Sequence, residues 1–257
     1  MLTLLNIGNT HVGSARFDGA GLRLLGAADT AEFDPDSLPA GDRIAVASVV
    51  PELSRRIAAR RPDAFFLSAA TAAGLLDFSR VDSSTLGADR IANAIAAAEF
   101  HPLPAIVIDC GSAITVELVD VGRRFSGGAI APGRRLMRLA LARGTAQLPG
   151  VETLSATPPA APGRNTVEQI ICGTDRGAVG MAKELAAALS AGLHPVSRLL
   201  TGGDAPFFAP ELPEFTPVPA DFTLRGLLAA ALGYFGATAS SPRPRSGHNP
   251  STPAGTP

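Results

Sequence analysis

The stretch Leu4-Leu5-Asn6-Ile7-Gly8-Asn9-Thr10 recurs in altered form as Val107-Ile108-Asp109-Cys110-Gly111-Ser112-Ala113. Both copies run from an apolar strand through Asn or Asp and one more apolar residue into glycine and a small polar side chain. Self-similarity of this kind is typical of a duplicated structural unit. A short pattern can also match by chance in a glycine-rich chain, so the repeat needs support from the sequence around it.

Strand and helix patterns alternate around the repeat and predict an α/β protein. Strands are expected at 2–7, 12–17, 44–50 and 105–108, and helices at 53–61, 86–100, 134–146, 167–189 and 224–235. Residues 123–132, with their adjacent glycines, are expected to form a turn region. A duplicated unit of this kind indicates two ribonuclease H-like halves, as in the actin and sugar-kinase superfold, with a nucleotide in the cleft between them.

We expect the two halves to span residues 1–104 and 105–238. Residues 239–257 are rich in proline and almost free of apolar side chains, so they cannot compensate for the entropy lost on ordering. A disordered tail is therefore expected there.

Composition excludes several classes of function. The chain of 257 residues is 46% hydrophobic, which is ample for buried cores, and its net charge of -1 gives no basic surface for a nucleic acid. The N-terminus has neither a basic stretch nor an apolar run long enough for a signal peptide or membrane span, so a cytoplasmic protein is expected. Cys110 and Cys172 lie in apolar surroundings without metal-ligand spacing, which favours reduced thiols.

The two glycine turns are candidate phosphate-binding elements. Gly8 permits close backbone approach to a phosphate, and Asn9 and Thr10 supply short polar donors beside it. Asp109, which precedes the second turn, is a candidate cation ligand. Ordinary β-turns, with Asp109 as a capping residue, remain the alternative.

Gly87-Ala88-Asp89-Arg90 places a carboxylate and a guanidinium at the expected start of a helix. Asp89 could accept a proton from an attacking hydroxyl, and Arg90 could bind a substrate carboxylate through two hydrogen bonds. The alternative is a carboxylate stabilised by the helix dipole beside a solvated arginine. Residues 201–204, TGGD, could contact adenine or ribose, or could simply join a strand to a helix.

The order of these motifs resembles that of type III pantothenate kinases from Met1 to about Leu232. The resemblance is carried by NIGNT at 6–10, ASVVPEL at 47–53, LGADRIANAIAA at 86–97, IDCGSAITVELVD at 108–120, FSGGAIAPG at 125–133, LARGTAQLP at 141–149, GRNTVEQIICG at 163–173, LLTGGDA at 199–205 and DFTLRGLLAAAL at 221–232. Many short matches in one order are far more specific than any single motif.

The resemblance implies ATP-dependent phosphorylation of pantothenate, the first step of coenzyme A biosynthesis, by a homodimer that uses Mg²⁺ and a monovalent cation, K⁺ or NH₄⁺. It implies that Asp89 is the general base and Asp109 the monovalent-cation ligand. Pantothenate would be bound by Gly87, Ala88, Asp89, Arg90 and, across the dimer interface, Thr166. ATP would be bound by Asn6, Ile7, Gly8, Asn9, Thr10, His11, Val12, Gly13, Ser112, Gly202 and Gly203.

The chain departs from the family pattern at a few positions. Asn6 stands where the family has an aspartate that helps to hold hydrated magnesium and the phosphates, so a negative charge is lost there. Ser112 replaces a threonine but keeps the hydroxyl, and Cys172 stands where serine is usual. The family often has an aromatic residue upstream of GADR, and residues 79–85 contain none, which leaves the lining of the substrate pocket open.

Three functions follow from these observations. The first is a working pantothenate kinase, and the second is an impaired relative with a regulatory or accessory role, which rests on Asn6. The third is another member of the superfold, such as a sugar kinase or a phosphatase, but those families do not combine GADR with GRNT in this order.

Overall fold

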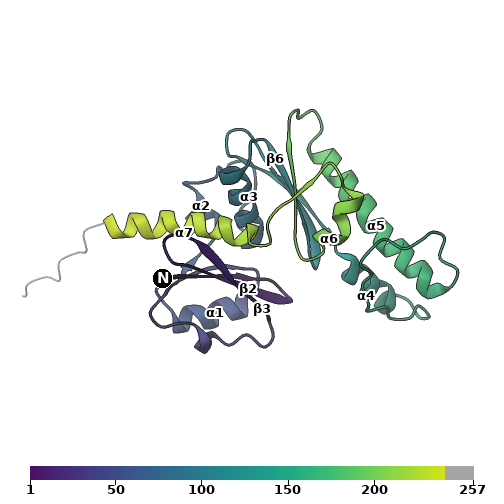
Figure 1. Ribbon diagram of the computed structural model, residues 1–257, viewed down its shortest axis with the longest axis horizontal. Helices are drawn as coiled ribbons and strands as arrows, with labels where there is room; N and C mark the ends of the chain where they lie inside the picture. The colour runs from purple at the N-terminus through teal and green to yellow at the C-terminus, as the bar shows by residue number, and fades with distance from the viewer. Residues whose placement is uncertain (241–257) are drawn as a thin grey trace, which may run out of the picture.

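The computed structural model describes residues 1–240, and Figure 1 shows two lobes, one on each side of helices α3 and α7. The tail expected at the C-terminus lies outside the described residues from position 241 onward.

The first lobe is built on a five-stranded sheet with the order β3-β2-β1-β4-β5. Its strands are β1 Leu2–Ile7, β2 His11–Phe17, β3 Leu22–Asp29, β4 Arg43–Ser48 and β5 Phe65–Phe66. β1 pairs antiparallel with β2 and parallel with β4, so it lies at the centre of the sheet and is buried on both faces.

The second lobe repeats this plan in a sheet with the order β10-β9-β6-β7-β8. Its strands are β6 Ala105–Cys110, β7 Ala113–Val119, β8 Phe125–Pro132, β9 Ser197–Thr201 and β10 Thr216–Pro217. β6 takes the place of β1, with an antiparallel partner in β7 and a parallel partner in β9. The expected fold class, two duplicated α/β halves, is confirmed, and the two repeated sequence stretches occupy equivalent central strands.

The helices cover both faces of each sheet. They are α1 Pro51–Arg60, α2 Ala69–Ala72, α3 Ala88–Phe100, α4 Arg134–Gly144, α5 Thr166–Leu189, α6 Ala205–Phe208 and α7 Phe222–Ser240, with short 3-10 helices η1 Pro35–Ser37 and η2 Ala209–Glu211. α1 packs Leu53 and Ile57 against one face of the first sheet, and α5 and α6 cover one face of the second.

Helix α3 is buried between the two lobes. Residues 91–97 are all buried, because Ile91, Ala92 and Ile95 pack with the first sheet and α7, whereas Ala96 and Ala97 pack against the second sheet. A helix that is apolar all round needs such a fully enclosed position. The small side chains of IANAIAAA therefore let both sheets approach a single helix.

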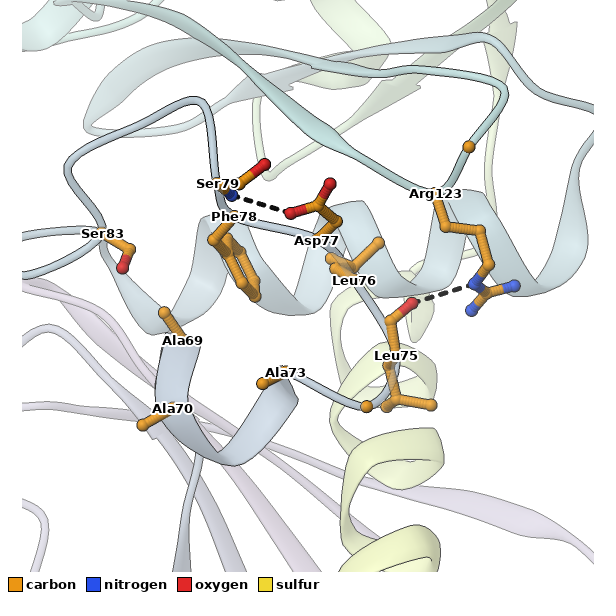
Figure 2. Close-up of a pocket in the computed structure, with 12 residues that line it drawn as sticks. Ala69, Ala70, Ala73, Leu75, Leu76, Asp77, Phe78, Ser79, Ser83 and Arg123 are labelled. Atoms are coloured by element: carbon orange, nitrogen blue, oxygen red, sulfur yellow. Dashed lines mark hydrogen bonds between the residues drawn. The ribbon is translucent and has the colours of Figure 1, made fainter.

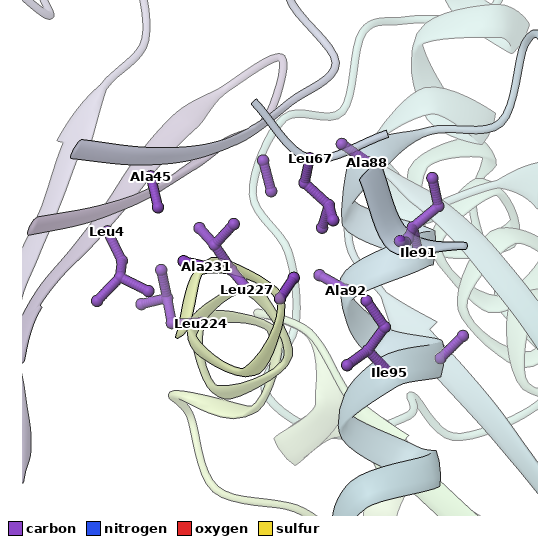
Figure 3. Close-up of a cluster of buried hydrophobic side chains, with 14 of the residues drawn as sticks. Leu4, Ala45, Leu67, Ala88, Ile91, Ala92, Ile95, Leu224, Leu227 and Ala231 are labelled. Atoms are coloured by element: carbon purple, nitrogen blue, oxygen red, sulfur yellow. The ribbon is translucent and has the colours of Figure 1, made fainter. Parts of the chain in front are cut away.

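Helix α7 ends the described chain but returns to the first lobe, where Leu224, Leu227 and Ala231 fill the space between Leu4 and Ala45 of the first sheet and helix α3 (Figure 3). It contacts β1, β4 and most extensively α3. The division of the sequence at residue 104 stays a prediction, and α7 supplies packing to the lobe that begins at residue 1.

Residues 125–132 form strand β8, so the turn expected across 123–132 is wrong for most of that range. Gly127 and Gly128 lie within this strand and do not form a turn. Gly127 has φ 112°, near the irregular register between β7 and β8, and a Cβ on Gly128 would come within 2.1 Å of the Val116 carbonyl oxygen. Strand β3 was not expected either, because it is an exposed edge strand without buried alternation.

Gly226 sets how closely α7 can approach α3, since a Cβ at this position would lie 1.9 Å from the Ala92 carbonyl oxygen. We expect Gly226→Ala to lower the free energy of unfolding by about 1–3 kcal/mol through overpacking. Gly233→Ala on the same helix meets open space and should instead stabilise by up to about 1 kcal/mol. Chemical denaturation followed by circular dichroism measures both, and equal effects would contradict this account of the contact.

Candidate active site

The glycine turns of the two lobes meet. Thr10 Oγ1 and Ser112 Oγ lie 3.0 Å apart, although 102 positions separate them in the sequence. Thr10 follows β1 and Ser112 follows β6, the two equivalent central strands. Two polypeptide turns, each with a hydroxyl side chain, therefore face one place, as a pair of phosphate-binding turns must.

The first turn is held by the strand beyond it. The backbone N–H of Gly8 donates to the His11 carbonyl oxygen at 2.9 Å, and the Thr30 hydroxyl donates to the Gly8 carbonyl oxygen at 2.8 Å. Ile7 and Val12 are buried in the core beneath α1, so of the residues predicted to bind ATP these two could contribute only their backbones. Asn9 and His11 are exposed, and Gly13 pairs with Asn6 across the ladder.

Asn6 lies at the end of β1 with its Oδ1 atom buried and, among the described residues, without a hydrogen-bond partner. An unpaired buried acceptor is costly unless it meets a water or a cation. The amide oxygen therefore fits a hydrated cation, but as a neutral ligand.

Asp109 occupies the equivalent position at the end of β6 and is partly buried. Its Oδ2 accepts a hydrogen bond of 2.8 Å from Asn93 Nδ2, and Asn93 Oδ1 accepts one of 2.7 Å from the Thr223 hydroxyl of α7. Burial raises the pKa of Asp109 to about 6, against the lowering effect of Asn93, and the charge of Asp89 adds to the increase. A carboxylate that is partly desolvated and lies near a second carboxylate fits a cation.

Gly202 follows β9 and closes over Asp109. It has φ 99°, and a Cβ there would lie 2.5 Å from Asp109 Oδ1 and 2.4 Å from the Cys110 carbonyl oxygen, so glycine is required by both conformation and space. A Cβ on Gly203 would meet nothing within 4 Å. The predicted TGGD motif thus reaches the second glycine turn.

Asp89 lies in the first turn of α3, where its Oδ1 accepts a 2.8 Å hydrogen bond from the backbone N–H of Arg90. A Cβ on Gly87 would come within 2.6 Å of the same oxygen, so the glycine leaves room for the carboxylate, whereas Ala88 is packed in the core. Burial raises the pKa of Asp89 in spite of the Arg90 N–H and charge. A carboxylate with a raised pKa is a better proton acceptor near neutral pH.

Arg90 is paired with a residue that the sequence analysis missed. Its Nε donates to Glu117 Oε1 of β7 at 2.7 Å, and its Cζ lies 5.8 Å from the centre of the Phe125 ring. Burial raises the pKa of Glu117, and the charge of Arg90 opposes that increase. A single glutamate inside the apolar strand AITVELV was the available signal.

An ion network that the sequence analysis also missed joins α4 to the TGGD turn. Arg134 binds Asp204 through Nε and Nη2, each at 3.2 Å, and approaches Asp175 at 3.3 Å, while Arg138 binds Asp175 at 2.6 Å. Both arginines are buried, so the network fixes the turn that covers Asp109.

Thr166 is exposed at the start of α5, where the Asn165 side chain caps the helix by accepting from the Glu168 N–H at 3.0 Å. Within residues 1–236, no hydrogen bond joins Thr166 to the GADR segment. A single chain thus brings together the GADR segment and the glycine turns but not Thr166.

A surface hollow of about 630 Å³ lies beside α2, where Figure 2 shows Asp77, Ser79 and Arg123 along its rim. Its lining includes none of the predicted site residues. The Asp77 carboxylate already accepts hydrogen bonds from the Ser79 N–H and from Arg124 Nε. Arg123 Nε donates to the Leu75 carbonyl oxygen. The hollow is therefore not the place where the buried carboxylates gather.

The part of the chain that the structure describes lacks two features, a membrane-spanning helix and a preformed cluster of metal ligands. No helix in it has the length and apolar character needed to span a membrane. That part of the chain also contains no group of three or more His, Cys, Asp or Glu residues placed to hold a metal ion.

Two duplicated lobes with paired glycine turns define the actin-like superfold of ATPases and small-molecule kinases. Solved structures agree on the fold. A Baf-family transcriptional activator from Campylobacter jejuni superposes with TM-score 0.58 at 17% identity, covering 91% of this chain and 99% of that one. An activator of 2-hydroxyisocaproyl-CoA dehydratase from Clostridium difficile with bound ADPNP gives TM-score 0.55 at 14% identity, covering 94% and 98%.

Sequence comparison then identifies the family. The family model for type III pantothenate kinase matches residues 2–188. The type III pantothenate kinase of Thermomicrobium roseum is 36% identical, covering 90% of this chain and 96% of its own, and that of Rubrobacter xylanophilus is 36% identical, covering 88% and 96%. The chain belongs to the type III pantothenate kinase family.

Asp89→Asn tests the general base. We expect kcat to fall by roughly 10²- to 10⁴-fold. Stability should not fall with it, because a carboxyl with a raised folded-state pKa stabilises fully only below its ordinary pKa, and that contribution is lost as the pH rises through the raised value. At pH 8 the melting temperature should therefore be equal or higher.

Asp77→Asn is the matched control. The Ser79 backbone N–H and Arg124 lower the pKa of Asp77 to about 2, so its stabilising contribution is present above the ordinary pKa and is lost only as the pH falls through about 2. We expect this variant to melt at a lower temperature at pH 8 and to keep its activity. If Asp89→Asn loses stability and activity together, Asp89 is a structural residue.

Proposed function

We propose that this protein transfers the γ-phosphoryl group of ATP to the primary hydroxyl of pantothenate, giving 4'-phosphopantothenate and ADP, the first step of coenzyme A biosynthesis. Family membership supplies the reaction. The observation that carries the proposal is the contact of the Thr10 and Ser112 hydroxyls, which brings the two glycine turns together. Asp89 and Asp109 lie close enough for the charge of one to raise the pKa of the other.

The residues present account for the steps of the transfer. The substrate hydroxyl oxygen attacks the γ-phosphorus, the bond from that phosphorus to the bridging oxygen breaks, and ADP leaves with the bond electrons. Asp89 accepts the hydroxyl proton, and Arg90 holds the far carboxylate so that the attacking oxygen is aligned. Phosphoryl transfer depends mostly on such positioning and on neutralised charge.

Two cations are part of the proposal. Mg²⁺ neutralises phosphate charge when bound with ATP, and Asn6 Oδ1 is the buried oxygen that would approach its hydration shell. Asp109 would hold the monovalent cation, K⁺ or NH₄⁺, since its carboxylate is partly buried and near a second negative charge.

An impaired relative of the kinases is the second candidate, and Asn6 is the observation that favours it. An amide keeps the shape of aspartate and one acceptor oxygen but loses the charge that attracts a hard dication. The catalytic carboxylate Asp89 is nevertheless present, so reduced metal affinity is expected before loss of chemistry.

A coupled assay of ADP release, with and without pantothenate and with each cation omitted in turn, tests the function. We expect pantothenate-dependent turnover by the natural chain. Asn6→Asp should lower the magnesium concentration at half-maximal rate or raise kcat, together by about 10- to 100-fold, as substitutions around a metal usually do. Turnover that appears only in Asn6→Asp would establish the impaired relative instead, and no turnover in either would contradict the kinase.

We also propose that the second lobe forms the homodimer. Large apolar side chains are exposed on β8, α4 and α5, elements that contact one another: Ile130, Leu136, Leu139 and Val167. Val167 is next to Thr166, so an interface here would bring the Thr166 of one subunit to the other. Exposed apolar patches usually mark an interaction site.

The double change Leu136→Glu and Leu139→Glu should convert the dimer into monomers, because two charges would be buried in the interface. Light scattering after size-exclusion chromatography measures the mass. Leu24→Glu with Leu25→Glu, on the exposed edge strand β3, is the control and should leave the dimer intact. A monomeric natural chain, or dissociation by the control pair, would contradict the proposed interface.

A further inference from the structure

Glu117 is a carboxylate in the protein interior, where desolvation makes its charge unfavourable. It lies in the middle of β7 and has 0% exposure. Its Oε2 atom accepts no hydrogen bond of good geometry among the described residues, although the Thr115 hydroxyl is near enough to lower the pKa of Glu117. Its other oxygen, Oε1, accepts from Arg90 Nε. Replacing a buried ion pair with apolar residues is often neutral or stabilising, so stability alone does not explain a half-satisfied buried carboxylate.

Glu117 determines which edge of the Arg90 guanidinium is occupied. Within the described chain, the hydrogen bond to Glu117 is the one that the guanidinium makes, and it uses Nε. Nη1 and Nη2 therefore remain as a pair of donors, and the side chain keeps 14% exposure. Two parallel N–H donors match the geometry of a carboxylate.

The strand beside the pair is shaped to accommodate the guanidinium. A Cβ on Gly128 of β8 would lie 2.1 Å from the Val116 carbonyl oxygen and 2.8 Å from Arg90 Nη2, so the glycine that the strand pairing requires also leaves space beside the guanidinium. Phe125 of the same strand lies under the guanidinium, with its ring centre 5.8 Å from Cζ. Residues of β7 and β8 therefore fix the orientation of the Arg90 guanidinium: Glu117 binds its Nε edge, and Phe125 packs against its plane.

Arg90 also has an acidic neighbour that it must not neutralise. Asp89 Oδ1 accepts from the backbone N–H of Arg90, and no ion pair joins Asp89 to the guanidinium within the described residues, although the guanidinium charge is close enough to lower the pKa of Asp89. By binding Nε, Glu117 keeps the guanidinium on the β7 side, where it cannot form an ion pair with the catalytic base.

We propose that Glu117 is a positioning residue that aims the free Nη1 and Nη2 donors of Arg90 at the carboxylate of the acceptor substrate. Glu117 thereby sets the preference of the enzyme for an acceptor that carries a carboxylate over the same acceptor with an alcohol in its place. The inference rests on the proposed function, which makes pantothenate the acceptor.

Glu117→Gln, assayed with pantothenate and with pantothenol, tests the proposal. A misdirected charge-assisted hydrogen bond weakens recognition, so KM for pantothenate should rise by about 10- to 100-fold, with the loss in KM rather than in kcat. KM for pantothenol, which has no carboxylate, should stay within about threefold, so the preference between the two acceptors collapses. A merely structural role would weaken both acceptors equally.

Two further variants keep the test decisive. Glu117→Met replaces the buried carboxylate with an apolar chain of similar length, and it gives the same comparison if Glu117→Gln does not fold. Glu99→Gln removes the partly exposed partner of Arg123 and should change neither acceptor. Equal loss for both acceptors in every folded Glu117 variant, or no loss for either, would overturn the positioning role.

Calorimetric binding of both compounds separates this inference from the proposed function. If the natural chain binds pantothenate without turnover and Glu117→Gln weakens that binding alone, the positioning role stands and the kinase proposal fails. Turnover by the natural chain with unchanged acceptor preference in the variants would leave the kinase and remove the positioning role. Absence of binding of either compound to the natural chain would overturn both.

Discussion

The enclosure of helix α3 between the two sheets is the constraint on which the rest of this structure depends. Its buried segment, residues 91–97, touches the first sheet and α7 on one side and the second sheet on the other. The first turn of the same helix carries Asp89 and Arg90. Because α3 contacts both lobes, any movement of one lobe against the other must also move the helix that carries the candidate base. The packing of its small side chains is therefore coupled to the geometry of the site.

The packing around α3 also affects the ionisation of the acidic residues near this helix. Glu117 is fully buried and Asp89 and Asp109 are partly buried, and within the described residues Arg90 contacts this group through an ion pair with Glu117. Desolvation raises the pKa of all three carboxyls, and their surplus negative charge is a standing cost to the folded protein. Sites that prepare for a charged reaction commonly carry such a cost, because the substrate and its cations supply the missing balance. The single hydrogen bond from Asn93 to Asp109 relieves only part of it.

The sequence was sufficient for the duplicated fold, since the repeat at Asn6 and Asp109 marks two equivalent central strands and the apolar periodicities place the helices. The family resemblance led to the expectation that both glycine turns bind one nucleotide, and the contact of Thr10 with Ser112 is consistent with that expectation. The sequence was misleading at β8, because Gly127 and Gly128 suggested a turn. In the structure, these glycines lie in a strand that is closely packed against its neighbours. Glu117 and the Arg134 network were missed, because pairing across 27 and 70 positions depends on strand register and lobe packing, which no local pattern contains.

Asn6 leaves the first lobe without the negative charge that Asp109 supplies at the equivalent position of the second lobe. In the first lobe the residue at the end of the central strand is a neutral amide with an unpaired buried oxygen, whereas the equivalent residue of the second lobe, Asp109, keeps its carboxylate. The duplicated turns are therefore electrostatically unequal. If the proposed dication is held between them, it would be attracted chiefly from the Asp109 and Asp89 side, and the phosphates of a bound nucleotide would meet less repulsion near Asn6. Weaker metal binding and weaker repulsion of nucleotide oppose each other, so the loss of one carboxylate need not abolish transfer.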